Sequence, residues 1–139
     1  MASGIFKKEY IAILDGILDK KSGTINLPIA RKKDSIIERC VSENGDNAIT
    51  EFELIKYLDN KYSLVKFILK TGRTHQIRVH AKAVGYPILG DTLYGRASNL
   101  INRQALHAYK LCFIHPIYKD LREFVSPIPI FFPFSSLIF

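Results

Sequence analysis

The hydrophobic pattern of the chain changes its period once, at Thr71-Gly72-Arg73, and this change limits the folds open to it. Before this point, short apolar runs alternate with polar residues, as in residues 48–57, which is typical of half-buried strands. After it, Ile77, Ala81 and Val84 fall on one face of a helix. The sequence therefore predicts an α+β fold with a mixed, mainly antiparallel sheet and few helices.

Turn signals divide the chain into the expected elements. Gly, Pro, Asn and Asp clusters separate apolar runs that we interpret as strands, and these cover residues 9–14, 23–30, 36–41, 48–57, 63–69, 105–114 and 121–125. The helix is expected to begin with Thr74 as its N-cap and to end at Gly85 as its C-terminal cap. A length of 139 residues fits a single domain, 1–139, with an apolar tail at residues 126–139.

The charge of the chain is basic and uneven. The formal net charge is +7, and residues 71–139 contribute 8 basic against 3 acidic side chains, a net of +5. An excess of this kind suits a polyanionic partner such as nucleic acid. The second half is therefore the expected site of contact with phosphates.

Cysteine and apolar content exclude several classes of protein. Cys40 and Cys112 belong to no CxxC pair, which argues against a disulfide framework and a structural zinc site. A reducing, cytoplasmic location is the simplest interpretation. No apolar run reaches the length of a transmembrane helix, so no membrane partner is expected. The uncharged tail is expected to pack on the chain itself, on an exposed sheet edge, or on a second copy.

The densest polar cluster is residues 71–80, at the start of the expected helix. Glycine beside a helix N-terminus lets the backbone approach an anion, and Arg73 and Arg78 can hold a carboxylate or a phosphate. A capped surface helix with solvated arginines explains the same residues. Composition favours that second interpretation, and the pattern leaves both open.

The other polar residues indicate neither a metal site nor a catalytic aspartate. His75 and His80 are five positions apart, whereas two ligands on a helix need a spacing of three or four. We therefore expect no metal site. Asp91 follows Gly90, and we expect it to close a turn or cap the next segment rather than to act in catalysis.

Three blocks in order, residues 71–80 (TGRTHQIRVH), 85–95 (GYPILGDTLYG) and 103–111 (RQALHAYKL), resemble the pseudouridine synthases of the RluA/RluD type. Residues 7–12 (KKEYIA) and 48–52 (AITEF) resemble the same family. The resemblance extends to about His115 and fades in the tail. It implies an enzyme that isomerises uridine to pseudouridine in structured ribosomal or transfer RNA, flips the target nucleotide, and needs no cofactor or metal.

The resemblance also implies roles for particular residues. Tyr10 matches the tyrosine that stacks on the base and assists proton transfer. Arg78 matches the arginine that pairs with the nucleophilic aspartate and keeps it ionised. Leu106 matches the apolar residue lining the base pocket. The residues expected to shape the entrance to the site or to support Arg78 are Arg73, Thr74, His75 and Gln76.

The nucleophilic aspartate of the family lies in a His-Arg-Leu-Asp run before the tyrosine segment, and no such run occurs in this sequence. We therefore expect the C-terminal portion of a catalytic domain, inactive by itself. A fragment of a longer enzyme, a split gene product and a natural remnant all fit. A non-catalytic basic RNA-binding module on the same scaffold and a structural ribosome-associated protein are the alternatives.

Overall fold

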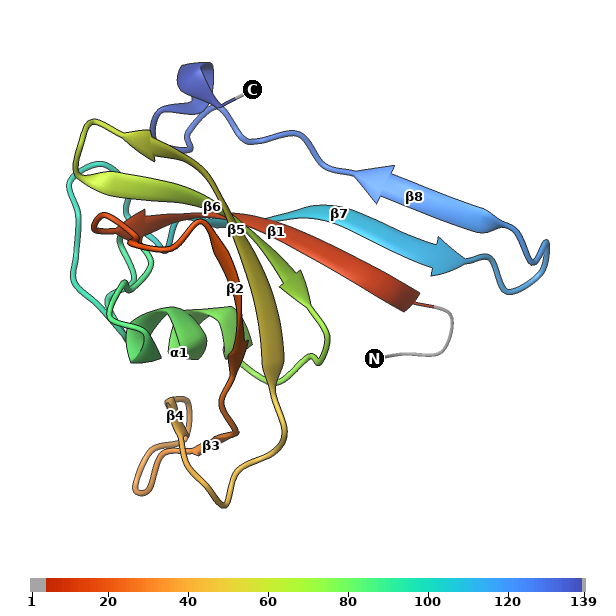
Figure 1. Cartoon of the computed structure of the whole chain (residues 1–139), viewed down its shortest axis with the longest axis horizontal. Helices are drawn as coiled ribbons and strands as arrows, with labels where there is room; N and C mark the ends of the chain where they lie inside the picture. Colours follow the sequence, from red (N-terminus) through yellow and green to blue (C-terminus); the bar gives the residue numbers. More distant parts are fainter. Residues whose placement is uncertain (1–4, 139) are drawn as a thin grey trace.

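The central element of the structure is a long strand, β1 (Ile5–Asp15), that pairs on both sides (Figure 1). The computed structural model describes residues 5–138. All strand pairs are antiparallel, and the six-stranded sheet has the order β2-β5-β6-β1-β7-β8. The other bounds are β2 (Ser22–Asn26), β5 (Ile49–Leu58), β6 (Tyr62–Leu69), β7 (Leu106–Ile114) and β8 (Leu121–Val125). A separate hairpin joins β3 (Ile29–Arg31) to β4 (Arg39–Val41). The predicted mainly antiparallel α+β fold is confirmed.

The helix α1 (Gln76–Ala83) and the C-terminal tail cover opposite faces of the sheet (Figure 1). His80 of α1 is hydrogen-bonded to Thr50, which lies opposite Leu69 in the β5–β6 ladder. Phe134 of the tail contacts Tyr62, which lies on β6 as Leu69 does. Odd- and even-numbered residues of one strand point to opposite faces, so Tyr62 and the tail lie on the face opposite Leu69 and α1. Because β1 is covered on both sides, its residues 11–14 are almost fully buried and form the middle of the core.

The structure places the tail against the chain's own sheet. Phe132 and Ile138 are buried, and Lys56 donates to the carbonyl of Leu137 in a short 3-10 turn, η1 (Ser135–Leu137). Ile130 points outward and is 95% exposed. The apolar content of the tail is thus partly explained by packing on β5 and β6. Phe139 lies outside the described residues.

Two of the expected strands are wrong in extent. The strand expected at residues 36–41 is reduced to β4, because residues 36–38 belong to the loop of the β3–β4 hairpin, where Ile36 is 85% exposed. The strand expected at residues 23–30 divides into β2 and β3. Pro28 lies at the break, and proline has no N–H with which to continue a ladder.

The helix begins differently from the prediction and ends as predicted. His75, with φ +56°, is the N-cap in place of Thr74, and no side chain of the described residues caps the helix by a hydrogen bond. At the other end Gly85 has φ +94°. Its N–H donates to the Lys82 carbonyl and the N–H of Tyr86 to that of Ala81, both at 3.0 Å, which is the Schellman arrangement. In the part of the chain that the structure describes, no helix is long and apolar enough to cross a membrane.

Gly85→Ala is expected to lower the free energy of unfolding by about 1 kcal/mol, because a side chain disfavours the left-handed backbone that the cap needs. The space around Gly85 is open, so the cost comes from the backbone and not from a clash. Gly72→Ala is the matched control, since that site is also open and has no positive φ. Urea unfolding checks both variants, and an equal change in the two would contradict this account.

Candidate functional site

Arg78 of α1 forms a bidentate ion pair with Asp91, which lies in the loop that follows the helix. Its Nε donates to Oδ2 and its Nη2 to Oδ1, both at 2.9 Å. The Asp91 side chain is 0% exposed and that of Arg78 is 16% exposed. Two parallel hydrogen bonds fix the plane of the guanidinium as well as its position.

The loop that carries Asp91 is held between β1 and the start of β7. Leu89 donates to the Ile13 carbonyl at 2.8 Å, and Ala105 donates to the Leu89 carbonyl at 2.9 Å. Gly90 has φ +78°, and a Cβ there would clash with the backbone carbonyl of Arg103. These contacts fix the backbone of the loop and place the Asp91 carboxylate beside α1.

Asp91 has two roles, of which the sequence predicted one. Its Oδ1 accepts hydrogen bonds from the N–H groups of Leu93 and Tyr94, both at 3.2 Å, so the expected turn closure is confirmed. The pairing with Arg78 was missed, because 13 positions separate the two residues and no local pattern links them.

The protonation states of the pair follow from its surroundings. Burial by itself raises the pKa of Asp91, but the hydrogen bond and charge of Arg78, with the two backbone N–H groups, lower that pKa below its usual value. The hydrogen bond to Asp91 in turn raises the pKa of Arg78. Both side chains are therefore charged at neutral pH.

One edge of the Arg78 guanidinium forms no hydrogen bond with the residues that the structure describes. Its bonds to Asp91 occupy Nε and one N–H of Nη2, and Nη1 forms no hydrogen bond with residues 5–138. A guanidinium has five N–H donors in a fixed plane. The arrangement can therefore hold a second anion while Asp91 keeps the group in place.

Tyr94 packs against Arg78 and connects it to the β3–β4 hairpin. The Arg78 Cζ lies 5.1 Å from the centre of the Tyr94 ring, a cation–π contact. The Tyr94 hydroxyl accepts from the backbone N–H of Arg39 at 2.8 Å and lies 2.7 Å from Nδ1 of His75. Burial, followed by the charges of Arg78 and Arg39, lowers the pKa of His75. Its ring is therefore neutral at pH 7 and can accept a hydrogen bond from the Tyr94 hydroxyl.

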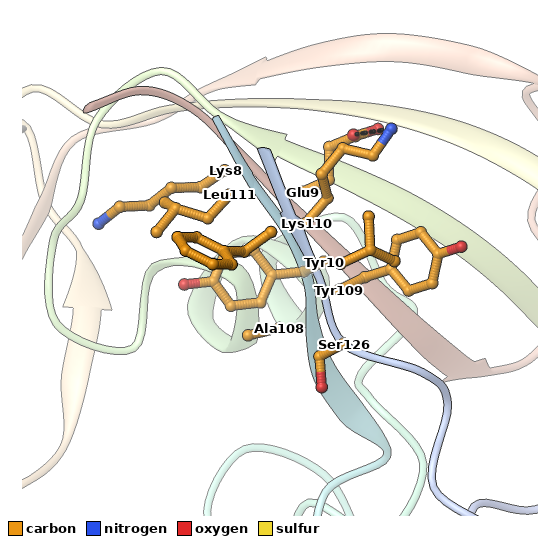
Figure 2. Close-up of a pocket in the computed structure, with 10 residues that line it drawn as sticks. Lys8, Glu9, Tyr10, Ala108, Tyr109, Lys110, Leu111 and Ser126 are labelled. Atoms are coloured by element: carbon orange, nitrogen blue, oxygen red, sulfur yellow. Dashed lines mark ion pairs between the residues drawn. The ribbon is translucent and has the colours of Figure 1, made fainter. Parts of the chain in front are cut away.

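Tyr10 lies on β1, beside a hollow of about 260 Å³ between β1, β7 and β8 (Figure 2). Figure 2 shows its ring on the same side of the strand as Lys8, with Glu9 and Tyr109 on the other side. Burial raises the pKa of Tyr10, so its hydroxyl stays protonated and can donate. Arg78 is not among the described residues that line this hollow.

Leu106 shares a face of the sheet with Tyr10. Tyr10 lies opposite Ala108 and Ala12 lies opposite Leu106 in the β1–β7 ladder. Side chains two positions apart on a strand point the same way. The two side chains thus share a face, but Leu106 lines a separate hollow next to Phe131 and Phe132 of the tail.

The residues expected at the entrance to the site differ in exposure. Gln76 is 2% exposed, and its amide accepts from Thr71 and from the N–H of Arg73 and donates to the carbonyl of Ile49 and to Thr50. All its hydrogen-bonding groups are used within the chain, so support of the helix that carries Arg78 is the role that its geometry fits.

The other expected entrance residues lie nearer the surface. Thr74 is exposed, His75 is half-buried against Tyr94, and Arg73 donates through Nε to the Asn47 carbonyl at 2.8 Å. No cluster of three or more His, Cys, Asp or Glu side chains that could hold a metal occurs within residues 5–138.

A family model described as RNA pseudouridylate synthase matches residues 2–83. The chain is 45% identical over 127 residues to an uncharacterized RNA pseudouridine synthase, YjbO, of Bacillus subtilis, covering 91% of the chain and 44% of that protein. It is 40% identical over 124 residues to the dual-specificity RNA pseudouridine synthase RluA of Haemophilus ducreyi, covering 85% and 56%. The chain thus spans about half the length of these curated relatives.

Two solved structures have a similar fold. The human RNA pseudouridylate synthase domain containing 1 matches with a TM-score of 0.75 and 30% identity, over 87% of this chain and 54% of that one. The human RNA pseudouridylate synthase domain containing 4 matches with a TM-score of 0.70 over 94% and 61%, and at 24% identity it supports the fold alone.

Proposed function

Because the chain belongs to the RNA pseudouridylate synthase family, we propose that it forms part of an active site that isomerises uridine to pseudouridine in ribosomal or transfer RNA. In this proposal Tyr10 stacks on the base and assists proton transfer, Leu106 lines the base pocket, and Arg78 holds the nucleophilic aspartate. Tyr10 and Arg78 both lie within the matched residues 2–83, and their assignment to one site is part of the proposal.

The observation that carries the proposal is the Arg78 guanidinium, oriented by a buried carboxylate and with one edge unused. A carboxylate placed at that edge would be kept ionised by the adjacent positive charge. Asp91 is not the nucleophile in this scheme, since it is 0% exposed and both its oxygens accept hydrogen bonds within the chain.

The nucleophile comes from a preceding segment in this proposal, because the sequence holds no His-Arg-Leu-Asp run. Arg78 and Tyr10 assist a carboxylate and cannot replace it. We further propose that the reaction needs no cofactor and takes place in the cytoplasm, where the free thiols of Cys40 and Cys112 would stay reduced.

The isolated chain is expected to release no tritium from RNA labelled at carbon 5 of uridine, since it lacks the nucleophile. Joining it to the portion of the Bacillus subtilis relative that precedes the tyrosine segment is expected to produce release. A joined protein in which the nucleophilic aspartate of that portion is changed to asparagine is the control.

The two arms contradict different parts of the proposal. Release by the isolated chain would mean that the nucleophile lies within the 139 residues. A joined protein that folds and binds RNA but releases nothing would favour the non-catalytic RNA-binding module.

A further inference from the structure

We propose that the groove between the β3–β4 hairpin and α1 binds a phosphate of the RNA backbone beside the target nucleotide. This inference rests on the proposed function, because it names a further contact of the same substrate. The groove has a volume of about 260 Å³, and its polar lining includes Lys32, Arg39, Lys82 and Tyr94. That volume is below the range of about 300–1,000 Å³ that is usual for drug-sized ligands, so it suits a small group such as a phosphate.

Positive charge in the groove exceeds negative charge. Lys32 and Arg39 come from the β3–β4 hairpin and Lys82 from α1, and Glu38 is the carboxylate among the lining residues. Glu38 pairs with Lys32 at 3.0 Å. Lys82 forms no ion pair within residues 5–138, and the guanidinium of Arg39 has only 3.4 Å contacts with backbone carbonyls. Two cations in the groove are therefore available to an anion.

The buried carboxylate nearby does not neutralise this groove. Asp91 directs its oxygens to Arg78 and to the N–H groups of its own turn. The lowered pKa of His75, to which the charges of Arg78 and Arg39 contribute after burial, agrees with a positive potential around the Tyr94 ring.

Tyr94 fixes the shape of the groove and links it to the candidate active site. Its hydroxyl accepts from the backbone N–H of Arg39, which ties the hairpin to the loop that carries Asp91. Arg78 lies 5.1 Å and Lys82 6.0 Å from the centre of its ring. A phosphate in the groove would therefore lie next to the nucleotide that Arg78 serves.

The test uses the 139-residue chain and a fluorescently labelled RNA stem-loop with uridine in its loop, with affinity measured by anisotropy from 50 to 300 mM salt. Lys82→Ala and Arg39→Ala are each expected to weaken binding about fivefold at 100 mM salt and to reduce the slope of log K against log salt by about 1. Lys82→Glu is expected to weaken it further.

Matched variants separate this site from general attraction to a basic protein. Lys61→Ala removes an exposed lysine at the β5–β6 turn and is expected to leave both affinity and slope unchanged. Glu38→Gln is expected to tighten binding. Arg39→Ala keeps the backbone N–H of residue 39, which donates a hydrogen bond to the Tyr94 hydroxyl, so the hairpin is expected to remain in place.

The possible results distinguish the groove from the proposed function. If the unchanged chain binds the stem-loop and the Lys82 and Arg39 variants, folded by circular dichroism, bind it equally well with the same slope, the groove proposal is wrong and the proposed function stands. If the unchanged chain shows no salt-dependent binding to RNA, the groove proposal is wrong, and tritium release by the joined protein decides the proposed function separately.

Discussion

Asp91→Ala is expected to lower the free energy of unfolding by about 3–5 kcal/mol, because it leaves the Arg78 charge without its partner. The variant also removes the acceptor for the N–H groups of Leu93 and Tyr94, which close the turn. Urea unfolding followed by circular dichroism measures the change.

An ion pair with one exposed member is the control for this loss. Asp15 pairs with Arg96 at 2.8 Å, but the Arg96 side chain is 79% exposed. Asp15→Ala is therefore expected to cost much less than Asp91→Ala. Equal losses at Asp15 and Asp91 would mean that burial does not decide the strength of the pair.

The pH dependence gives a second measure of the same pair. The pKa of Asp91 in the folded state lies below its ordinary value of 3.8, so its ionisation stabilises the protein above that value. This stability is lost as the pH falls through the lower, folded pKa. Asp91→Asn keeps a turn acceptor and loses the charge, so its deficit relative to the unchanged chain is expected to be full at pH 7 and smaller below about pH 4. A deficit that stays constant down to pH 3 would contradict the shift.

Local features of the fold could be predicted from the sequence because their signals are local. The end of α1 needs a left-handed residue at one position, and Gly85 supplies it within the helix's own pattern. The β5–β6 hairpin likewise follows from alternation and from the turn signal at Asp59-Asn60. Both features depend on residues a few positions apart.

The pairing of Arg78 could not be predicted in the same way. It depends on the path of the loop that returns from the helix past Ile13 and Ala105, and that path is set by contacts between distant segments. Gln76 shows the same limit. The sequence left open whether it shapes the entrance or supports Arg78, and the hydrogen bonds that favour support join it to β5, a distant segment.

The count of charges along the sequence also did not locate the candidate RNA-binding surface. The sequence placed most of the excess positive charge after residue 70, but Lys110 lies near Glu9 and Glu123, which offset its charge. The candidate groove instead combines Lys32 and Arg39 with Lys82. Folding brings the two halves together, so a tally along the chain cannot locate such a surface.

Arg78→Ala, in a protein that supplies the nucleophilic aspartate, is expected to reduce kcat by about 10²–10³-fold, because a charged group that orients and stabilises the reacting carboxylate is lost. The affinity for RNA is expected to change less than about threefold, since Arg78 is largely buried against Asp91 and Tyr94. Single-turnover tritium release and filter binding measure the two effects.

A merely structural role for Arg78 must be separated from a catalytic one, because Arg78→Ala also leaves Asp91 buried and unpaired. The double variant Arg78→Ala/Asp91→Asn removes both charges and is expected to regain most of the lost stability. If it remains as inactive as Arg78→Ala, the lost activity comes from the missing guanidinium. If activity returns together with stability, Arg78 serves the fold alone. Arg78→Lys is expected to stay impaired, because a lysine cannot bond in one plane to Asp91 and to a second carboxylate.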